Sequence, residues 1–287
     1  MLGNLREAAI GSREKTVRIG LCAPGTRLAE ETARRAVALA GEIYGERVEL
    51  WFHPQCFQSA GHFAGDDETR TRALLDIAND PQFDALWFAR GGYGACRIAP
   101  GLIARLNEAA SAKKYLGYSD IGFLLGGLYR AGVGRLAHGP MPVDLGRAGG
   151  EAAFRRGLAW LVEDAVWGLE AGTTPGHANV AFNLTILSQL LGTPLEPVLD
   201  GHVIQIEDIG EYMYRLDRYF FHVTSNVNVQ RCAGIRLGRC SAIPKNDPDF
   251  GMTEEEVARH WCERSGIAYL GRADIGHDID NKIVPFG

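Results

Sequence analysis

The chain has 287 residues and a mass of 31.3 kDa, a length that fits one large domain or two smaller ones. Hydrophobic residues make up 46% of it and charged residues 23%, which is enough apolar material for a globular core. A net charge of −5 and an isoelectric point near 5.9 argue against non-specific nucleic-acid binding, which requires a concentrated basic face.

We recognise neither a targeting signal nor a metal-binding motif in the sequence. The first twenty residues carry charges throughout, and no apolar stretch approaches the length of a membrane span. The six cysteines form no CxxC pair, and the eight histidines show no HxxxH or HxH spacing. We therefore expect a cytoplasmic protein with no membrane contact, no disulfide framework, no metal and no cofactor.

Strand-like and helix-like segments alternate over the first half of the chain. Apolar runs of strand length predict strands at Thr16 to Ala23, Val48 to Phe52, Asp84 to Phe88, Lys114 to Gly117 and Arg135 to His138. Helical spacing or acidic first turns predict helices at Leu28 to Tyr44, Asp66 to Ala78, from about Ala95, and from about Asp120 to Arg130. This alternation predicts a doubly wound, mainly parallel sheet with helices on both faces.

After Pro142 the rhythm changes, which indicates a second, smaller domain. Helices are expected at Glu151 to Glu163, Asn183 to Leu191, Glu211 to Asn226 and Thr253 to Ser265, with strands at Val203 to Ile206 and Ala233 to Leu237. A Gly/Thr/Pro-rich break spans Glu170 to Ala178. The predicted organisation is an N-terminal domain over residues 1–150, a linker over 151–175, and a smaller, β-rich α/β domain over 176–287.

The segment KKYLGYSDI places Ser119 where a buried strand turns sharply into a helix. Such a turn presents a hydroxyl at the carboxyl edge of the sheet, and hydrolases use it to expose a nucleophile. The backbone N–H of the next residue can then face a developing oxyanion. The alternative is that Ser119 only caps the helix, because serine is favoured at helix starts.

The glycine-rich loop Arg90 to Gly94 (RGGYG) lies between a predicted strand and a predicted helix. Its glycines could cradle a phosphate, but the Lys-Ser/Thr of a P-loop and the spacing of a dinucleotide fingerprint are absent. They could instead bring backbone N–H groups close to Ser119, or simply form a tight turn that needs positive φ.

A serine nucleophile needs a base, and the base needs an orienting acid. Glu207 directly follows an apolar strand and could project into a cleft, although it could equally start the next helix. His277 lies in an irregular segment, ADIGHDIDN, where an exposed histidine is the plain alternative. The order Ser, acid, His is that of the α/β-hydrolases, but Ile121 stands where the last glycine of their GxSxG motif belongs.

Taken in order, the strings RGGYG, GYSD, LEPVLDGHVIQIEDIGE and the terminal GH…N…PFG resemble the LD-carboxypeptidases, a family of serine peptidases that includes the microcin-immunity peptidases. The resemblance spans nearly the whole chain. It implies a Ser119–His277–Glu207 triad in a cleft between the two domains. It also implies an oxyanion hole made by the backbone N–H groups of Asp120 and Gly92.

The resemblance further implies a small peptide substrate with an L,D bond before a C-terminal D-residue, as in cytoplasmic recycling of murein tetrapeptides. We expect Arg90, Tyr93 and Phe182 to contact substrate. Arg90 could hold the terminal carboxylate, although Arg215 and Arg218 are equally open as donors. Homodimers occur among the LD-carboxypeptidases, and the aromatic helix from Tyr212 to Phe221 could supply an interface.

The chain departs from the family pattern in ways that leave the substrate open. Phe182 stands in place of a usual glycine, and Ala273 to Gly276 replaces a usual Pro-Phe-Gly-His. One alternative is a microcin-immunity-like peptidase that cleaves peptidyl or aminoacyl nucleotide conjugates, with Trp160, Trp167 and Phe182 as candidates for base stacking. A second is a non-catalytic peptide- or nucleotide-binding module that uses the same cleft.

Overall fold

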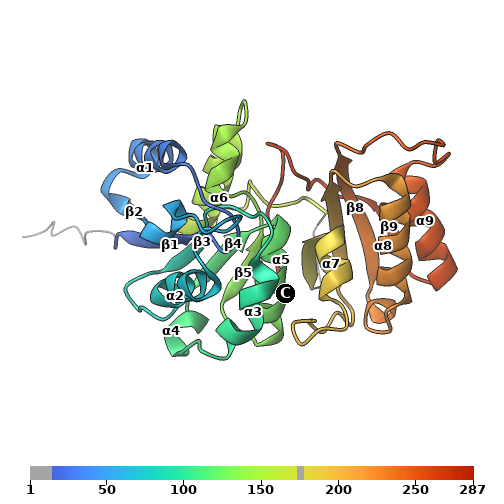
Figure 1. Ribbon diagram of the computed structural model, residues 1–287, viewed down its shortest axis with the longest axis horizontal. Helices are drawn as coiled ribbons and strands as arrows, with labels where there is room; N and C mark the ends of the chain where they lie inside the picture. The colour runs from blue at the N-terminus through green and yellow to red at the C-terminus, as the bar shows by residue number, and fades with distance from the viewer. Residues whose placement is uncertain (1–14, 173–177) are drawn as a thin grey trace, which may run out of the picture.

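A mostly parallel sheet and a second, fully parallel sheet organise the chain into two lobes that lie side by side (Figure 1). The computed structural model describes residues 15–172 and 178–287. The first lobe holds a six-stranded sheet in the order β10-β5-β4-β3-β1-β2, and the second a four-stranded sheet in the order β6-β7-β8-β9. The predicted α/β class is confirmed. None of the helices in the described ranges has the length and apolar character that a membrane span requires.

The first sheet is covered by helices on both faces, as the strand–helix alternation predicted. Its parallel strands are β1 (Val17–Cys22), β2 (Val48–Phe52), β3 (Ala85–Phe88), β4 (Lys114–Gly117) and β5 (Arg135–His138). Trp87 and Leu116 on one face join a core with α1 (Glu30–Tyr44) and α6 (Glu151–Glu163). Leu86 and Tyr115 on the other face pack with α2 (Asp67–Ala78), α3 (Ala95–Ile103) and α5 (Gly122–Arg130). A short helix, α4 (Glu108–Ser111), precedes β4.

The segment expected to link the domains belongs largely to the first lobe. Helix α6 lies on the sheet, and the ring of Phe154 stacks on Trp87 with centroids 5.0 Å apart. The bounds predicted for this helix are correct, but its packing partner was not predicted, because an amphipathic pattern does not say which surface the apolar face will meet. Part of the predicted break, residues 173–177, lies outside the described residues.

The second sheet is formed by β6 (Asn179–Asn183), β7 (Val203–Ile209), β8 (Gly234–Ser241) and β9 (Tyr269–Arg272). Ile204 and Ile206 of β7 share a core with α7 (Leu184–Leu190), α8 (Met213–Ser225) and α9 (Glu254–Ser265). Because side chains alternate along a strand, Glu207 points to the opposite face. The segment that returns from β9 to the first lobe contributes Ala273 and Ile275 to a small cluster on that face.

The chain then returns to the first sheet through β10 (Val284–Pro285), which pairs antiparallel with β5. The N–H of Gly287 donates to the carbonyl of Asn179 in β6 at 3.0 Å, so the two sheets meet at this point. The C-terminus accordingly lies near α5, between the lobes (Figure 1).

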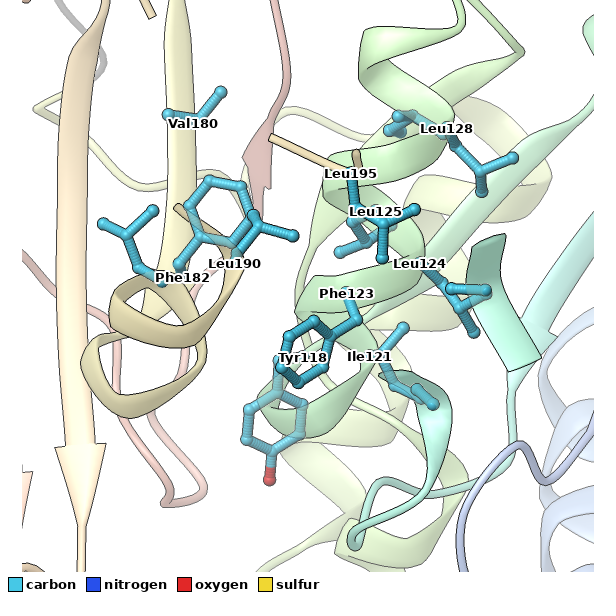
Figure 2. Close-up of a cluster of buried hydrophobic side chains, with 14 of the residues drawn as sticks. Tyr118, Ile121, Phe123, Leu124, Leu125, Leu128, Val180, Phe182, Leu190 and Leu195 are labelled. Carbon is cyan, nitrogen blue, oxygen red and sulfur yellow. The ribbon is translucent and has the colours of Figure 1, made fainter. Parts of the chain in front are cut away.

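The lobes share an apolar core. Figure 2 shows Phe123 and Leu125 of α5 facing Phe182 and Leu190 of the second lobe. Phe182 is 1% exposed, and its ring also meets Phe286 edge-on at 5.3 Å. The lobes are therefore held together by continuous packing, and the groups at their boundary keep a fixed separation.

Candidate active site

Ser119 stands two residues after the end of β4, at the carboxyl edge of the first sheet. Its φ of +64° lies in the left-handed region, which costs an L-residue about 1–2 kcal/mol. The residue opens a 3₁₀ turn, η3 (Ser119–Ile121), that leads into α5, and neither element has a side-chain cap hydrogen bond. The hydroxyl of Ser119 is therefore not used as a helix cap, and the strained turn presents it to the second lobe.

A chain of hydrogen bonds joins Ser119, His277 and Glu207. Nε2 of His277 lies 3.0 Å from Oγ of Ser119, and its Nδ1 lies 2.6 Å from Oε2 of Glu207. Because an ionised carboxylate can only accept, Nδ1 carries the proton and Nε2 is left to accept from the serine hydroxyl. The three side chains thus have the arrangement of nucleophile, base and orienting acid.

Glu207 lies inside β7, which runs on to Ile209, so the alternative that it starts a helix is not what the structure has. Its side chain is fully buried, and the ladder between β7 and β8 shifts register beside it. Gly238 of β8 lies against it: a Cβ there would come within 2.9 Å of the Glu207 Cβ and 2.7 Å of the Ile275 carbonyl oxygen. The glycine allows the His277 segment to approach the strand closely.

Polar contacts fix the segment that carries His277. Arg239 forms ion pairs with Asp274 and Asp278 on either side of the histidine. The N–H of Gly276 donates to Oδ1 of Asn281 at 3.1 Å. The His277 side chain is only 9% exposed. His277 is therefore fixed in position and nearly buried, and it is not the solvated loop histidine that was the alternative from the sequence.

Burial and charge act in opposite directions on the two histidines of the site. Burial lowers the pKa of His277, but the charge and the hydrogen bond of Glu207 outweigh it and raise the pKa above the ordinary 6.5. His138 is buried with Asn281 as its partner, and there burial lowers the pKa to about 4. Of these two histidines, His277 is therefore the one whose surroundings favour the protonated form.

The glycine-rich loop after β3 lies against the nucleophile. A Cβ on Gly91 would come within 3.2 Å of the Ser119 Cβ, and Gly92 has a φ of +84°. The carboxylate of Asp120 accepts the N–H of Ala95 at 2.7 Å and so ties the serine turn to the first turn of α3. Burial raises the pKa of Asp120 to about 6. This loop and the turn bring backbone N–H groups to the neighbourhood of Ser119.

The structure separates the residues expected to contact substrate. Tyr93 is 55% exposed beside the rings of His62 and Phe63, and Arg90 is half-buried and donates to the carbonyl of Arg27 at 3.0 Å. Phe182, by contrast, is enclosed in the core between the lobes, so its predicted place on the cleft wall is not what the structure has.

The other nominated cations and aromatics lie elsewhere. Arg215 pairs with Glu211 on α8, and Arg218 lies over the ring of Tyr214 on the same helix. Helix α8 covers the face of the second sheet opposite to Glu207. Trp160 lies on the buried face of α6, while Trp167 is exposed.

Sequence reasoning missed Tyr118 and Arg147. The Tyr118 ring lies 4.9 Å from the His277 ring, and its hydroxyl accepts from Nη1 of Arg147 at 3.0 Å. The string GYSD placed Tyr118 beside the nucleophile, but nothing in it indicated a contact with the base. Within the described ranges no three His, Cys, Asp or Glu side chains form a metal-binding group.

Comparison with known proteins agrees with this architecture. Residues 19–139 match the LD-carboxypeptidase N-terminal domain, and residues 180–287 match the LD-carboxypeptidase C-terminal domain. The chain therefore belongs to the LD-carboxypeptidase family of peptidases.

Particular relatives carry related names. The chain is 33% identical to a putative carboxypeptidase from Synechocystis sp., over 79% of this chain and 75% of the relative. It is 26% identical to the murein tetrapeptide carboxypeptidase of Pseudomonas aeruginosa, over 94% and 91%.

Solved structures share the fold. The muramoyltetrapeptide carboxypeptidase of Oxalobacter formigenes superposes with a TM-score of 0.78 at 23% identity, covering 93% of each chain. MccF bound to glutamyl sulfamoyl guanosine superposes with a TM-score of 0.73 at 17% identity, covering 94% of this chain and 95% of that one.

Proposed function

We propose that this protein is a serine LD-carboxypeptidase that releases a C-terminal D-amino acid from a murein tetrapeptide in the cytoplasm. The observation that carries the proposal is the hydrogen-bonded series Ser119–His277–Glu207, which joins a strained serine to a buried carboxylate through a nearly buried imidazole. Family membership and the relatives named for murein tetrapeptides support the choice of substrate.

In the proposed reaction, Oγ of Ser119 attacks the carbonyl of the L-residue while His277 takes the hydroxyl proton at Nε2. Glu207 holds the imidazole and stabilises the imidazolium. The backbone N–H groups of Asp120 and Gly92 bind the oxyanion. When the C–N bond breaks, His277 gives its proton to the leaving amine, and the L-residue remains as an ester on Ser119. Water, deprotonated by His277, then hydrolyses this ester and restores the enzyme.

A nucleotide conjugate is the second candidate substrate, and one observation favours it. The exposed Tyr93 ring beside His62 offers an aromatic surface next to the glycine-rich loop, on which a base could stack. The aromatic residues named from the sequence support it less, because Trp160 and Phe182 are enclosed in the core. The tetrapeptide is therefore the substrate we propose.

The test is a substrate panel with purified protein and its Ser119→Ala variant. Release of free D-alanine from murein tetrapeptide by the wild type, and none by Ser119→Ala, is the expected result. Turnover of an aminoacyl nucleotide conjugate but not of tetrapeptide would select the second candidate. A non-catalytic binding module would bind peptide without turnover, and an acylating serine probe would then fail to label Ser119.

A further inference from the structure

Arg147 places a cation beside the base of the triad. It follows a 3₁₀ turn, η4 (Pro142–Gly146), after β5, and its side chain is 35% exposed. We infer that Arg147 binds the C-terminal carboxylate of the peptide substrate and so makes the enzyme act at chain ends. This inference rests on the proposed hydrolysis and adds the residue that selects the substrate.

Two polar side chains hold the guanidinium in place from one side. Its Nη1 donates to the hydroxyl of Tyr118 at 3.0 Å and to the carboxylate of Asp144, which is 1% exposed. The other oxygen of Asp144 accepts the N–H of Met141 at 2.9 Å. Within the described ranges, the hydrogen bonds of Arg147 all use this nitrogen, so Nε and Nη2 keep the two-pronged edge that a carboxylate matches.

The position suits the leaving residue. His277 must protonate the leaving amine, so the C-terminal residue has to lie on the His277 side of the scissile bond. Its carboxylate is only two covalent bonds from that amine nitrogen. Tyr118 lies against His277, and its hydroxyl points away from the apolar cluster in Figure 2 and meets Arg147. The charge of Arg147 is close enough to act on the pKa of His277, where it opposes protonation.

Three other arginines near the site are less suited to this role. Arg239 uses all three of its nitrogens on Asp274 and Asp278. Arg156 is 5% exposed and donates to carbonyls of the segment that carries His277. Arg90 lies in the glycine-rich loop, where its Nη1 donates to the carbonyl of Arg27 at 3.0 Å, and no contact joins it to His277 or Tyr118 within the described ranges. Arg147 is therefore the cation that best meets the terminal carboxylate.

The experiment compares two substrates that differ only at the end: a tetrapeptide ending in D-alanine and the same peptide ending in D-alaninamide. Wild type should strongly prefer the free acid. In Arg147→Gln the KM for the acid should rise about 10- to 100-fold, the scale of a lost charge-assisted hydrogen bond, with little change in kcat. Turnover of the amide should fall far less than turnover of the acid, because the amide carries no charge for Arg147 to bind. Arg147→Lys, which keeps the charge but not the fork, should fall between the two.

Arg34→Gln removes an exposed arginine from α1 and is the control for loss of a positive charge. If Arg147→Gln slowed the acid and the amide by the same factor, Arg147 would only support Tyr118 and Asp144, and the inference would be overturned.

Binding separates this inference from the proposed function. Calorimetry of acid and amide peptides against Ser119→Ala and Ser119→Ala/Arg147→Gln needs no turnover. If wild type hydrolysed neither peptide, the proposed function would fail. The inferred site would stand only if acid binding still depended on Arg147, and equal binding by both variants would overturn it.

Discussion

Replacing Glu207 by glutamine tests the electrostatic core of the site. The substitution keeps the size of a fully buried side chain and removes its charge. In the wild type the Glu207 charge overcomes burial and raises the pKa of His277 above 6.5. Because the imidazole must be neutral to accept the Ser119 proton, the activity of the wild type should fall as pH drops through this raised pKa.

The neighbouring His138 shows in which direction the pKa of His277 should move when Glu207 loses its charge. His138 is buried, has an amide partner in Asn281 and has a pKa lowered to about 4. In Glu207→Gln, His277 acquires the same kind of surroundings, so its pKa should move from above 6.5 toward that of His138. The acid limb of kcat/KM should therefore move to lower pH. The plateau should fall by about 10⁴-fold, the loss typical when the acid of a triad becomes an amide.

The assay is D-alanine release from tetrapeptide between about pH 4.5 and 8.5. Glu49→Gln, an exposed glutamate of β2 paired with Arg18, controls for the charge change and should leave the profile unaltered. An acid limb at the wild-type pH in Glu207→Gln would refute the reasoning, because the titrating group would then not be a histidine held by Glu207. A loss below about tenfold would refute the role of the carboxylate itself.

Further substitutions test the supporting geometry. Ser119→Gly should be inactive yet about 1 kcal/mol more stable than Ser119→Ala in thermal unfolding, because glycine accepts the positive φ without strain; equal stabilities would contradict the strained turn. Gly238→Ala should lose about 10²-fold in kcat and about 2 kcal/mol of stability, because the added methyl group meets Ile275 and Glu207. As a control, Gly41→Ala in the open part of α1 should be fully active and slightly stabilised. A fully active Gly238→Ala would exclude the close approach of the His277 segment to β8. Asp120→Asn should gain stability relative to wild type as pH rises from about 4 to 7, because a carboxyl with a folded pKa raised to about 6 is most favourable when protonated. The difference in unfolding free energy should approach about 3 kcal/mol, and a pH-independent difference would count against the raised pKa.

Periodicity predicted the first lobe well and the second less well. The strands β2, β4 and β5 and helix α6 have the bounds that their apolar patterns indicated. Strand β6 was missed because it lies between the predicted break that ends at Ala178 and the helix predicted from Asn183, with no turn to separate it from that helix. Strand β9 was missed because it contains a glycine with positive φ and alternates between half-buried and exposed residues. Strand β10 has two residues and forms because β5 offers it a free edge. Such a strand depends on tertiary structure and has no pattern of its own in the sequence.

The missed strand also explains the error at Phe182. Within β6, Val180 and Phe182 face the core shared by the lobes, while Ala181 faces the returning segment. Without the strand there was no alternation from which to assign a face, and the large ring was placed in the cleft. Arg147 was missed for a different reason: its partners Tyr118 and Asp144 form a site only after β4 and β5 are adjacent.

Ser119, Glu207 and His277 lie far apart in the sequence, so the segment that returns from β9 to the first lobe has to bring them together. Ser119 stands at the edge of the first sheet and Glu207 in the second, and His277, on the segment that crosses between them, touches both. That crossing is fixed a few residues later, where β10 joins β5 and Phe286 packs against Phe182 and Tyr129. The apolar contact that excludes Phe182 from the cleft is thus part of what holds the imidazole between its two partners. Loosening it should weaken the Ser119–His277 contact before it unfolds either lobe, because each lobe keeps its own sheet and helices.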